Sequence, residues 1–206
     1  MNVDSISLRE KVAREAANLL YSGVEKEYKQ AKQKAAKTLG IHFLPTNLEV
    51  AIELDKIADE NEGKARQERL IQMRKEALKL MQILKAYKPL LIGSVWRGTV
   101  CYDSDMDIVV YHDEPDDILR ILKQNNLKII QTEWVTVTKK GRVKGSFHVY
   151  VELPAKEKVE IKIAQSSEAS FKKEKCEIYG DEITGLRVKE LEKVLKENPT
   201  QRFVPF

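Results

Sequence analysis

The sequence predicts an α+β protein in which a helical N-terminal region precedes a region rich in β-strands. Apolar residues recur at helical spacing through roughly the first 86 residues, and strand-like alternation begins after Pro89. With 42% hydrophobic and 33% charged residues, the composition is that of a globular protein. The 206 residues suffice for one core domain with an extension. We expect an N-terminal helical region over 1–63 and a core, with a C-terminal helix and tail, over 64–206.

The N-terminal half should form helices over three stretches: 7–39, 46–58 and 64–86. Thr46 followed by Glu49 matches a capping box, which starts a helix by pairing two backbone N–H groups with side chains. Gly23 is expected to divide the first stretch into two helices, and the polar run 59–63 is expected to end the second. The apolar stripes of these helices are interpreted as packing faces.

After Pro89 the pattern predicts five strands, over 90–92, 106–111, 127–138, 143–153 and 159–163. Three helices should accompany them: a short one from Ser94, then 115–125 and 186–197. The tail over 198–206 contains two prolines and two phenylalanines, so we expect it to pack as an irregular strap. Both tryptophans, Trp96 and Trp134, are expected in the core.

Two aspartates at the second of these strands form the strongest functional signal. Asp105 and Asp107 are one residue apart and lead into an apolar run, so in an extended chain their side chains point to the same face. Two neighbouring carboxylates repel each other unless a cation lies between them. Hard oxygen ligands suit Mg²⁺, which usually keeps one or two protein carboxylates and completes its shell with water and substrate phosphate. An Asp-x-Asp pair alone is also common on solvated strand edges and in turns, so the prediction of a magnesium site depends on what lies beside the pair.

A Gly-Ser turn lies upstream of the aspartates. Gly93 and Ser94 follow an apolar run and open the short helix, and Ser94 precedes Asp105 by eleven residues. Free backbone N–H groups and the positive end of a helix dipole can hold a phosphate at such a turn. A carboxylate pair beside a phosphate-binding turn is the smallest set of groups that an enzyme needs for nucleotidyl transfer.

Together these residues resemble the signature of the polymerase-beta-type nucleotidyltransferase superfamily: an apolar residue, Gly-Ser, a spacer, and then Asp-apolar-Asp-apolar. The segment Arg97-Gly98-Thr99 is similar to one found in the minimal nucleotidyltransferases of prokaryotes and in archaeal-type CCA-adding enzymes. The match is specific over residues 90–111 and absent from the first 60. The resemblance implies a nucleotidyltransferase-type mixed β-sheet flanked by helices, with a nucleoside triphosphate as substrate.

Two metal ions are rarely held by two aspartates alone, so a third carboxylate is expected on a neighbouring strand. In the stretch 159–163 the odd residues are apolar, which leaves Glu160 and Lys162 on the opposite face. Glu160 is the favoured third metal ligand, and it also falls where the superfamily places its third acidic residue, although an aspartate is commoner there. Glu152 is the competing candidate. The cofactor prediction is therefore two Mg²⁺ ions bound by Asp105, Asp107 and a third carboxylate.

Other polar residues have two interpretations each. Arg97 contacts phosphate or forms a structural ion pair, and Lys162 reaches the triphosphate or balances the charge of the neighbouring carboxylate. His148 and Tyr150 share one face of their strand, where they meet base or acceptor; a half-exposed strand histidine without chemistry is the favoured account for His148. The basic turn over 139–144 is interpreted either as a nucleic-acid contact or as a solvated hairpin tip.

The favoured hypothesis is a Mg²⁺-dependent enzyme that transfers NMP, with AMP preferred, from a nucleoside triphosphate to a hydroxyl acceptor and releases pyrophosphate. RNA, a protein and a small molecule are the candidate acceptors. The alternatives are a catalytically idle, antitoxin-like binding module and a polymerase of RNA tails. The N-terminal helices would bind the acceptor or form a homodimer interface. Two cysteines without metal-site spacing and no membrane-length apolar run lead us to expect a cytoplasmic protein without a membrane partner.

Overall fold

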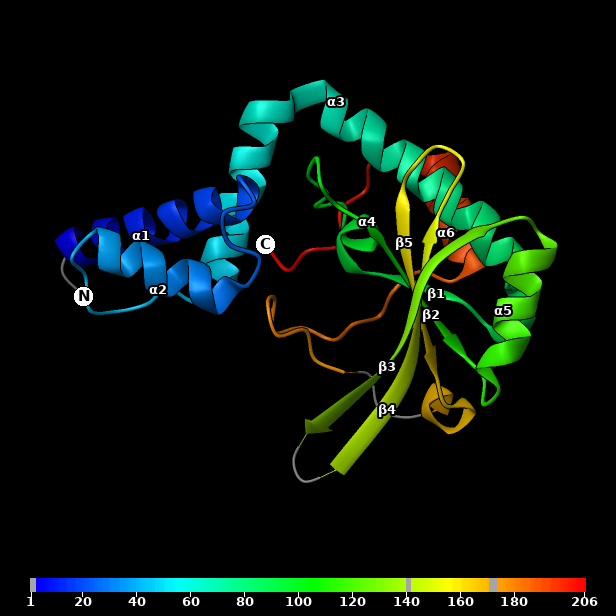
Figure 1. The fold of residues 1–206 in the computed structure, drawn as a ribbon. Helices are drawn as coiled ribbons and strands as arrows, with labels where there is room; N and C mark the ends of the chain where they lie inside the picture. The colour runs from blue at the N-terminus through cyan, green and yellow to red at the C-terminus, as the bar shows by residue number, and fades with distance from the viewer. Residues whose placement is uncertain (1–2, 140–141, 171–173) are drawn as a thin grey trace. The chain divides into compact units, whose positions relative to one another are not determined.

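The computed structural model describes the backbone of residues 3–139, 142–170 and 174–206, and the side chains of 8–136, 145–169 and 174–206. Its described residues form the α-helices α1 (Val3–Tyr21), α2 (Tyr28–Thr38), α3 (Asn47–Ile83), α4 (Gly93–Arg97), α5 (Pro115–Gln124) and α6 (Val188–Glu197) (Figure 1). Short 3₁₀ helices cover Lys85–Tyr87 and Ser166–Ser170. Within the described part of the chain, no helix has both the length and the apolar character needed to cross a membrane.

The β-strands are β1 (Leu90–Ile92), β2 (Met106–Tyr111), β3 (Lys128–Lys139), β4 (Arg142–Glu152) and β5 (Lys158–Ala164). They form one sheet in the order β1-β2-β5-β4-β3. β2 and β5 are parallel, whereas the β1–β2, β5–β4 and β4–β3 pairs are antiparallel. The sheet is therefore mixed, and the predicted fold class, an N-terminal helical region followed by a mixed sheet with helices, is confirmed.

The chain divides into two compact units. The first comprises the described residues of Met1–Arg66 together with Glu174–Glu182 and Val204–Phe206. Its core is built largely from alanines, with Ala16, Ala31 and Ala35 fully buried between α1, α2 and the first part of α3. Small side chains of this kind allow helices to approach closely. The predicted boundary at residue 63 stays a prediction.

The second unit comprises Gln67–Lys173 and Ile183–Phe203 and contains the whole sheet. One face of the sheet packs against α3, α5 and α6 through a core in which Leu91, Ile108 and Ile161 have no exposed surface (Figure 1). Because side chains alternate along a strand, the residues between these apolar positions point to the other face. The predicted functional carboxylates of β2 and β5 belong to that opposite face.

The polar run 59–63 separates two helical segments as predicted, and it does so at its last residue. Residues 59–62 stay helical, and Gly63, with φ 51° and ψ −123°, kinks α3 between the two segments. Residues 59–62 remain helical because glutamate is a good helix former and charged residues are readily solvated on an exposed helix face. The prediction for Trp134 is wrong. Trp134 is 68% exposed on β3 and not in the core, whereas Trp96 is 3% exposed as expected.

Other predicted features are confirmed. Gly23 has a positive φ of 71° between α1 and α2, and the capping box forms because Thr46 N donates to Glu49 Oε2 at 2.6 Å and Glu49 N donates to Thr46 Oγ1 at 3.2 Å. The tail is a strap over its residues 199–203, with Phe203 N donating to Arg97 O at 2.9 Å.

Candidate active site

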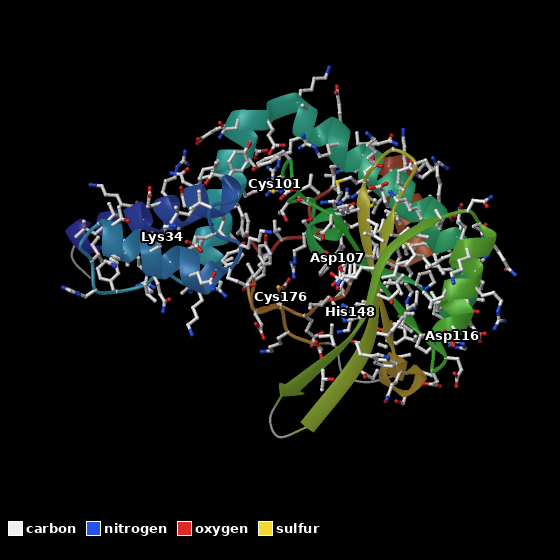
Figure 2. The ribbon with its side chains drawn as sticks, in the orientation of Figure 1. Lys34, Cys101, Asp107, Asp116, His148 and Cys176 are labelled. Carbon is white, nitrogen blue, oxygen red and sulfur yellow. The ribbon has the colours of Figure 1, made fainter. Side chains whose placement is uncertain are left out.

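Strand register brings three carboxylates together on the open face of the sheet. Asp107 in β2 is the direct register partner of Glu160 in the parallel strand β5, and Asp105 lies just before the start of β2. One carboxylate oxygen from each of the three residues lies within 4.8 Å of the others. Figure 2 labels Asp107 on the sheet. The structure thus places Glu160 beside the aspartate pair.

Glu152, the competing candidate, lies elsewhere. Its Oε1 forms an ion pair with Lys128 Nζ at 2.7 Å, and its register partner in β5 is Lys158. The lysine holds the pKa of the Glu152 carboxyl below its usual range. Glu152 therefore forms a peripheral ion pair and is not part of the carboxylate cluster.

The pKa values of both aspartates are raised by their surroundings. The pKa of Asp107 is raised to about 7, first by burial and then by the negative charges of Asp105 and Glu160. The pKa of Asp105 is also raised, first by desolvation of a carboxyl that lines a recess and then by Glu160 and Asp103. Three ionised carboxylates at this spacing are unfavourable without a compensating cation. The donor set, all oxygen and all anionic, fits a hard divalent ion.

Gly93 allows the close approach of Asp107. It has a positive φ of 70°, and a Cβ placed on it would lie only 1.9 Å from Asp107 Oδ2. No other residue type would leave this carboxylate where it is, because a real Cβ is not found that close to an oxygen. Ser94 follows at the start of α4 and is half-buried. The structure thus places the predicted Gly-Ser turn directly beside the predicted metal ligand.

Arg97, predicted either as a phosphate contact or as a structural ion pair, makes contacts within the protein, and its phosphate contact stays a prediction. Its side chain is buried, with the guanidinium carbon 4.4 Å from the centroid of the Trp96 ring. Nη1 donates to the carbonyl of Phe203 in the tail at 3.0 Å. These contacts favour the structural interpretation of Arg97, with the C-terminal strap as its partner.

A second buried arginine, Arg74, holds α4 in place through hydrogen bonds to its backbone. Arg74 of α3 has no exposed surface and donates hydrogen bonds to the backbone oxygens of Val95 and Trp96 at 3.1 and 2.9 Å. It also donates to the carbonyls of Pro199 and Gln201, each at 2.8 Å. Burial lowers the pKa of Arg74 to about 10. Arg74 therefore ties α3, the Gly-Ser helix and the tail together.

Side chains of β4 surround Glu160. His148 Nδ1 and Tyr150 Oη both hydrogen-bond Glu160 Oε1, the tyrosine at 3.3 Å. Tyr150 Oη also donates to Glu133 Oε1 at 2.8 Å, and the pKa of Tyr150 is raised by burial and by these two acidic neighbours. Our sequence interpretation of His148 as a histidine without chemistry missed this contact. The signal was its placement two residues from Tyr150, on the polar face of an alternating strand.

Lys162 lies two residues after Glu160 on the same strand, and its register partner in β4 is His148. Its side chain is half-buried on the face that carries the carboxylates. Among the described residues it has no hydrogen bond or ion pair. Its predicted contact with phosphate stays a prediction. The turn centred on 140–141, the predicted nucleic-acid contact, lies outside the residues whose side chains are described.

A cavity of about 420 Å³ opens beside Asp105. Its lining contains three cationic and three acidic side chains, those of Arg69, Lys156 and Lys158 and of Asp103, Asp105 and Glu157. Asp105 belongs both to this cavity and to the carboxylate cluster. The size of the cavity suits a small ligand.

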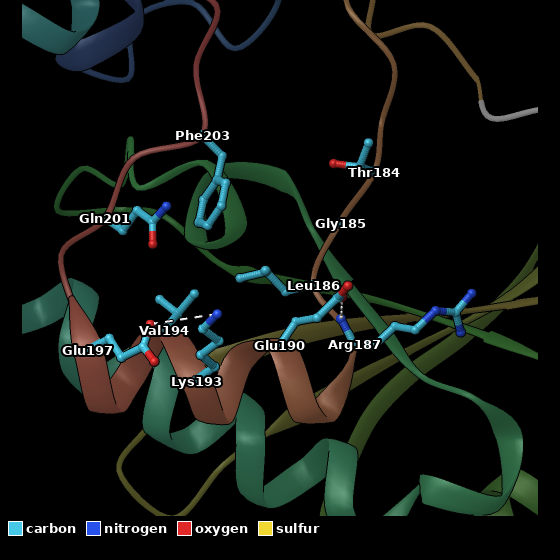
Figure 3. A pocket seen from close by; sticks show the side chains of 10 residues that line it. All are labelled: Thr184, Gly185, Leu186, Arg187, Glu190, Lys193, Val194, Glu197, Gln201 and Phe203. Carbon is cyan, nitrogen blue, oxygen red and sulfur yellow. Dashed lines mark hydrogen bonds and ion pairs between the residues drawn. The ribbon is translucent and has the colours of Figure 1, made fainter.

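A second cavity, of about 520 Å³, lies between α6 and the tail (Figure 3). Its floor contains Leu186, Val194 and Phe203, and charged side chains of α6 stand at its edge. None of the three clustered carboxylates lines it. We therefore assign the candidate active site to the carboxylate cluster.

Comparison with known proteins finds no matching family model and no matching curated protein. Similar solved structures include Cid1, with RNA terminal uridylyl transferase activity, at 15% identity and a TM-score of 0.33, covering 54% of this chain and 36% of that one. A cytoplasmic RNA terminal U-transferase matches at 15% and 0.33, with coverages of 57% and 34%. The Cid1 poly(U) polymerase with MgGTP matches at 17% and 0.32, with coverages of 54% and 38%. The matched region spans little more than a third of those chains.

Proposed function

We propose that the protein is a nucleotidyltransferase that uses Mg²⁺ to transfer NMP from a nucleoside triphosphate to a hydroxyl group. The observation that supports this proposal is the convergence of Asp105, Asp107 and Glu160 within 4.8 Å, with Asp107 held against Gly93. The pKa of Asp107 is raised to about 7 by desolvation and then by its acidic neighbours, so a bound cation would favour the ionised carboxylate at neutral pH. The site is therefore built for a positively charged ligand.

The three carboxylates are the residues that would hold the metal, and the proposal includes two ions. When bound, divalent ions lower the pKa of an acceptor hydroxyl and stabilise charge on the transferred phosphoryl group and on the leaving pyrophosphate. In the overall reaction the acceptor oxygen bonds to the α-phosphorus as the bond to the β-phosphate oxygen breaks. The hydroxyl proton passes to solvent water, and pyrophosphate leaves with the oxygen that had bridged the α- and β-phosphorus atoms.

Phosphate contacts are proposed on two sides of the cluster. Ser94, with the backbone of Gly93, would contact the β- and γ-phosphates from the side of Asp107. Lys162 would contribute a positive charge from the strand that carries Glu160. Charge-assisted hydrogen bonds to phosphate are shorter and stronger than neutral ones, so these few groups suffice to orient the triphosphate.

The cavity beside Asp105 is the proposed entry for a substrate. Lys156, Lys158 and Arg69 on its wall would contact the phosphates, and the acidic side chains of Asp103 and Glu157 lie among them. We keep AMP as the preferred transferred group, and RNA, a protein side chain and a small hydroxyl compound as candidate acceptors. The N-terminal helices remain the proposed acceptor-binding or dimerisation element.

A transfer assay tests the proposal. The full chain is incubated with Mg²⁺, each α-labelled nucleoside triphosphate and either total RNA or cell lysate. We expect label on one acceptor class and its loss with EDTA and in the Asp105→Asn/Asp107→Asn variant. Mn²⁺ and nucleotide binding by the same proteins are measured in parallel. Nucleotide binding without transfer to any acceptor would support the idle binding module instead. Absence of both metal binding and transfer would contradict the nucleotidyltransferase proposal.

A further inference from the structure

The two carboxylate oxygens of Glu160 have different surroundings. Both of its hydrogen bonds, from His148 and from Tyr150, go to Oε1. Oε2 accepts no hydrogen bond from any residue that the structure describes. A carboxylate that is held through one oxygen is fixed in rotation, and its second oxygen remains available as a ligand atom.

His148 is the main restraint on Oε1. Tyr150 has a single hydroxyl proton, and its oxygen lies 2.8 Å from Glu133 Oε1 but 3.3 Å from Glu160 Oε1. Since one proton forms one strong hydrogen bond, that proton belongs mainly to the contact with Glu133. The imidazole of His148 therefore provides the close donor to Glu160.

His148 is itself held in place by Ser146. Ser146 Oγ lies 2.8 Å from His148 Nε2, and the His148 side chain is only 13% exposed. An ionised carboxylate can only accept, so Nδ1 must carry the proton that points at Glu160. In a neutral ring Nε2 then accepts the Ser146 hydroxyl proton. The carboxylate thus selects the tautomer with the proton on Nδ1, and the Ser146 hydroxyl, which can donate or accept, is compatible with it.

We propose that His148 is a positioning residue for the metal site: by holding Oε1 of Glu160, it directs Oε2 toward the two aspartates as the ligand atom for a divalent cation. This inference rests on the proposed function. Histidine and carboxylate groups that orient ligands in this way typically change metal affinity by about 10- to 100-fold when they are removed. In many metal sites a carboxylate orients a histidine ligand. Here the roles are exchanged: the carboxylate of Glu160 is the ligand, and His148 orients it.

The same three residues also have the connectivity of a Ser–His–carboxylate triad, with serine on Nε2 and the acid on Nδ1. A nucleophilic role for Ser146 is disfavoured because the residue is 9% exposed and lies within β4. Glu160, in addition, faces two other carboxylates, which a triad acid does not. The positioning role accounts for both features.

Mn²⁺ binding by the full chain, measured from the free-ion EPR signal, tests the inference. His148→Leu replaces the imidazole with an apolar side chain of moderate size and removes the Nδ1–H donor. We expect the dissociation constant of this variant for Mn²⁺ to rise about 10- to 100-fold. His148→Asn keeps an N–H donor near the position of Nδ1, and its affinity should be closer to wild type than to His148→Leu. If transfer activity is measured as well, excess Mg²⁺ should partly restore the activity of His148→Leu.

His112→Leu is the matched control. His112 Nε2 also hydrogen-bonds a carboxylate, that of Asp117 at 3.0 Å, but it follows the other end of β2. Its Mn²⁺ affinity should equal that of wild type. If His148→Leu binds Mn²⁺ as tightly as wild type, the positioning role is wrong. If wild type itself binds no Mn²⁺, the proposed function fails first, so the two failures are distinguishable.

A measurement on the wild-type protein covers the case in which His148→Leu does not fold. Long-range ¹H–¹⁵N correlation spectra of selectively labelled histidine report which ring nitrogen carries the proton. We expect Nδ1 of His148 to be protonated at neutral pH. A neutral ring with its proton on Nε2 would overturn the inference, because such a ring has no donor for Glu160.

Discussion

Gly93 and Asp107 lie in such close contact that residue 93 has no room for a side chain: a Cβ there would be 1.9 Å from Asp107 Oδ2. This contact joins the turn after β1 to the carboxylate of β2, two segments that are register neighbours through Ile92 and Asp107. The contact sets the position of Asp107 relative to Ser94. Four predictions follow from this and from related contacts.

Gly93→Ala should displace Asp107 and lower Mn²⁺ affinity and transfer activity by at least about tenfold, comparable to loss of a group that orients a metal ligand. Gly180→Ala is the matched control, because Gly180 has a similar φ of 75° but no atom within 4 Å of an added Cβ. Both variants carry the left-handed backbone strain of about 1–2 kcal/mol. Equal metal affinity in the two variants would show that the contact with Asp107 has no functional weight.

Asp107→Asn should abolish metal-dependent transfer while stabilising the metal-free protein at alkaline pH. The neutral amide removes a half-buried negative charge that is poorly solvated and that Asp105 and Glu160 repel. Thermal unfolding at pH 8 in EDTA is the measurement, with Asp113→Asn as control, since the pKa of the exposed Asp113 is lowered and its charge is favourable. A lower Tm for Asp107→Asn than for wild type would contradict the electrostatic account of the cluster.

The contribution of Asp107 to the stability of the metal-free protein, taken as the difference between wild type and Asp107→Asn, should fall as pH rises from about 4 to 7. The folded-state pKa of Asp107, about 7, lies above its usual value near 3.8, so the folded state binds the proton more tightly across this window and stability falls with increasing pH. Each unit of pKa difference contributes at most about 1.4 kcal/mol. Mg²⁺ should raise Tm at pH 8 and have little effect at pH 5. Calorimetry at both pH values, with and without Mg²⁺, measures this; a Mg²⁺ effect independent of pH would refute it.

Arg74→Met should lower the free energy of unfolding by at least ~3 kcal/mol, because four backbone carbonyls lose a charged donor and each such bond contributes about 1.5–3 kcal/mol. Urea unfolding measures the change. Arg120→Met is the control, since Arg120 is exposed and forms only a surface ion pair with Asp117, worth about 0–1 kcal/mol. A loss no larger than that of the control would mean that the tail and α4 do not depend on Arg74.

Local patterns explain which elements were predicted from sequence. The alternation of apolar residues around Glu160 and Asp107 identified both strands and the face on which each acid lies, because a strand has a period of two. The capping box at Thr46 was likewise predicted from a local pattern of four residues. The error at Trp134 has another origin, because a long hairpin strand carries its side chain to an exposed position.

The sequence by itself determined the donor chemistry of the site: a Gly-Ser turn, an aspartate pair on one strand face, and a short set of candidates for the third acid. The tertiary structure decided which candidate joins the pair, because the parallel register of β2 and β5 sets Glu160 opposite Asp107 and leaves Glu152 with Lys128. The tertiary structure also buries Arg97 against the tail and brings His148 within hydrogen-bond distance of Glu160. These are contacts between segments far apart in sequence, and pairing register and burial arise only when the whole sheet packs.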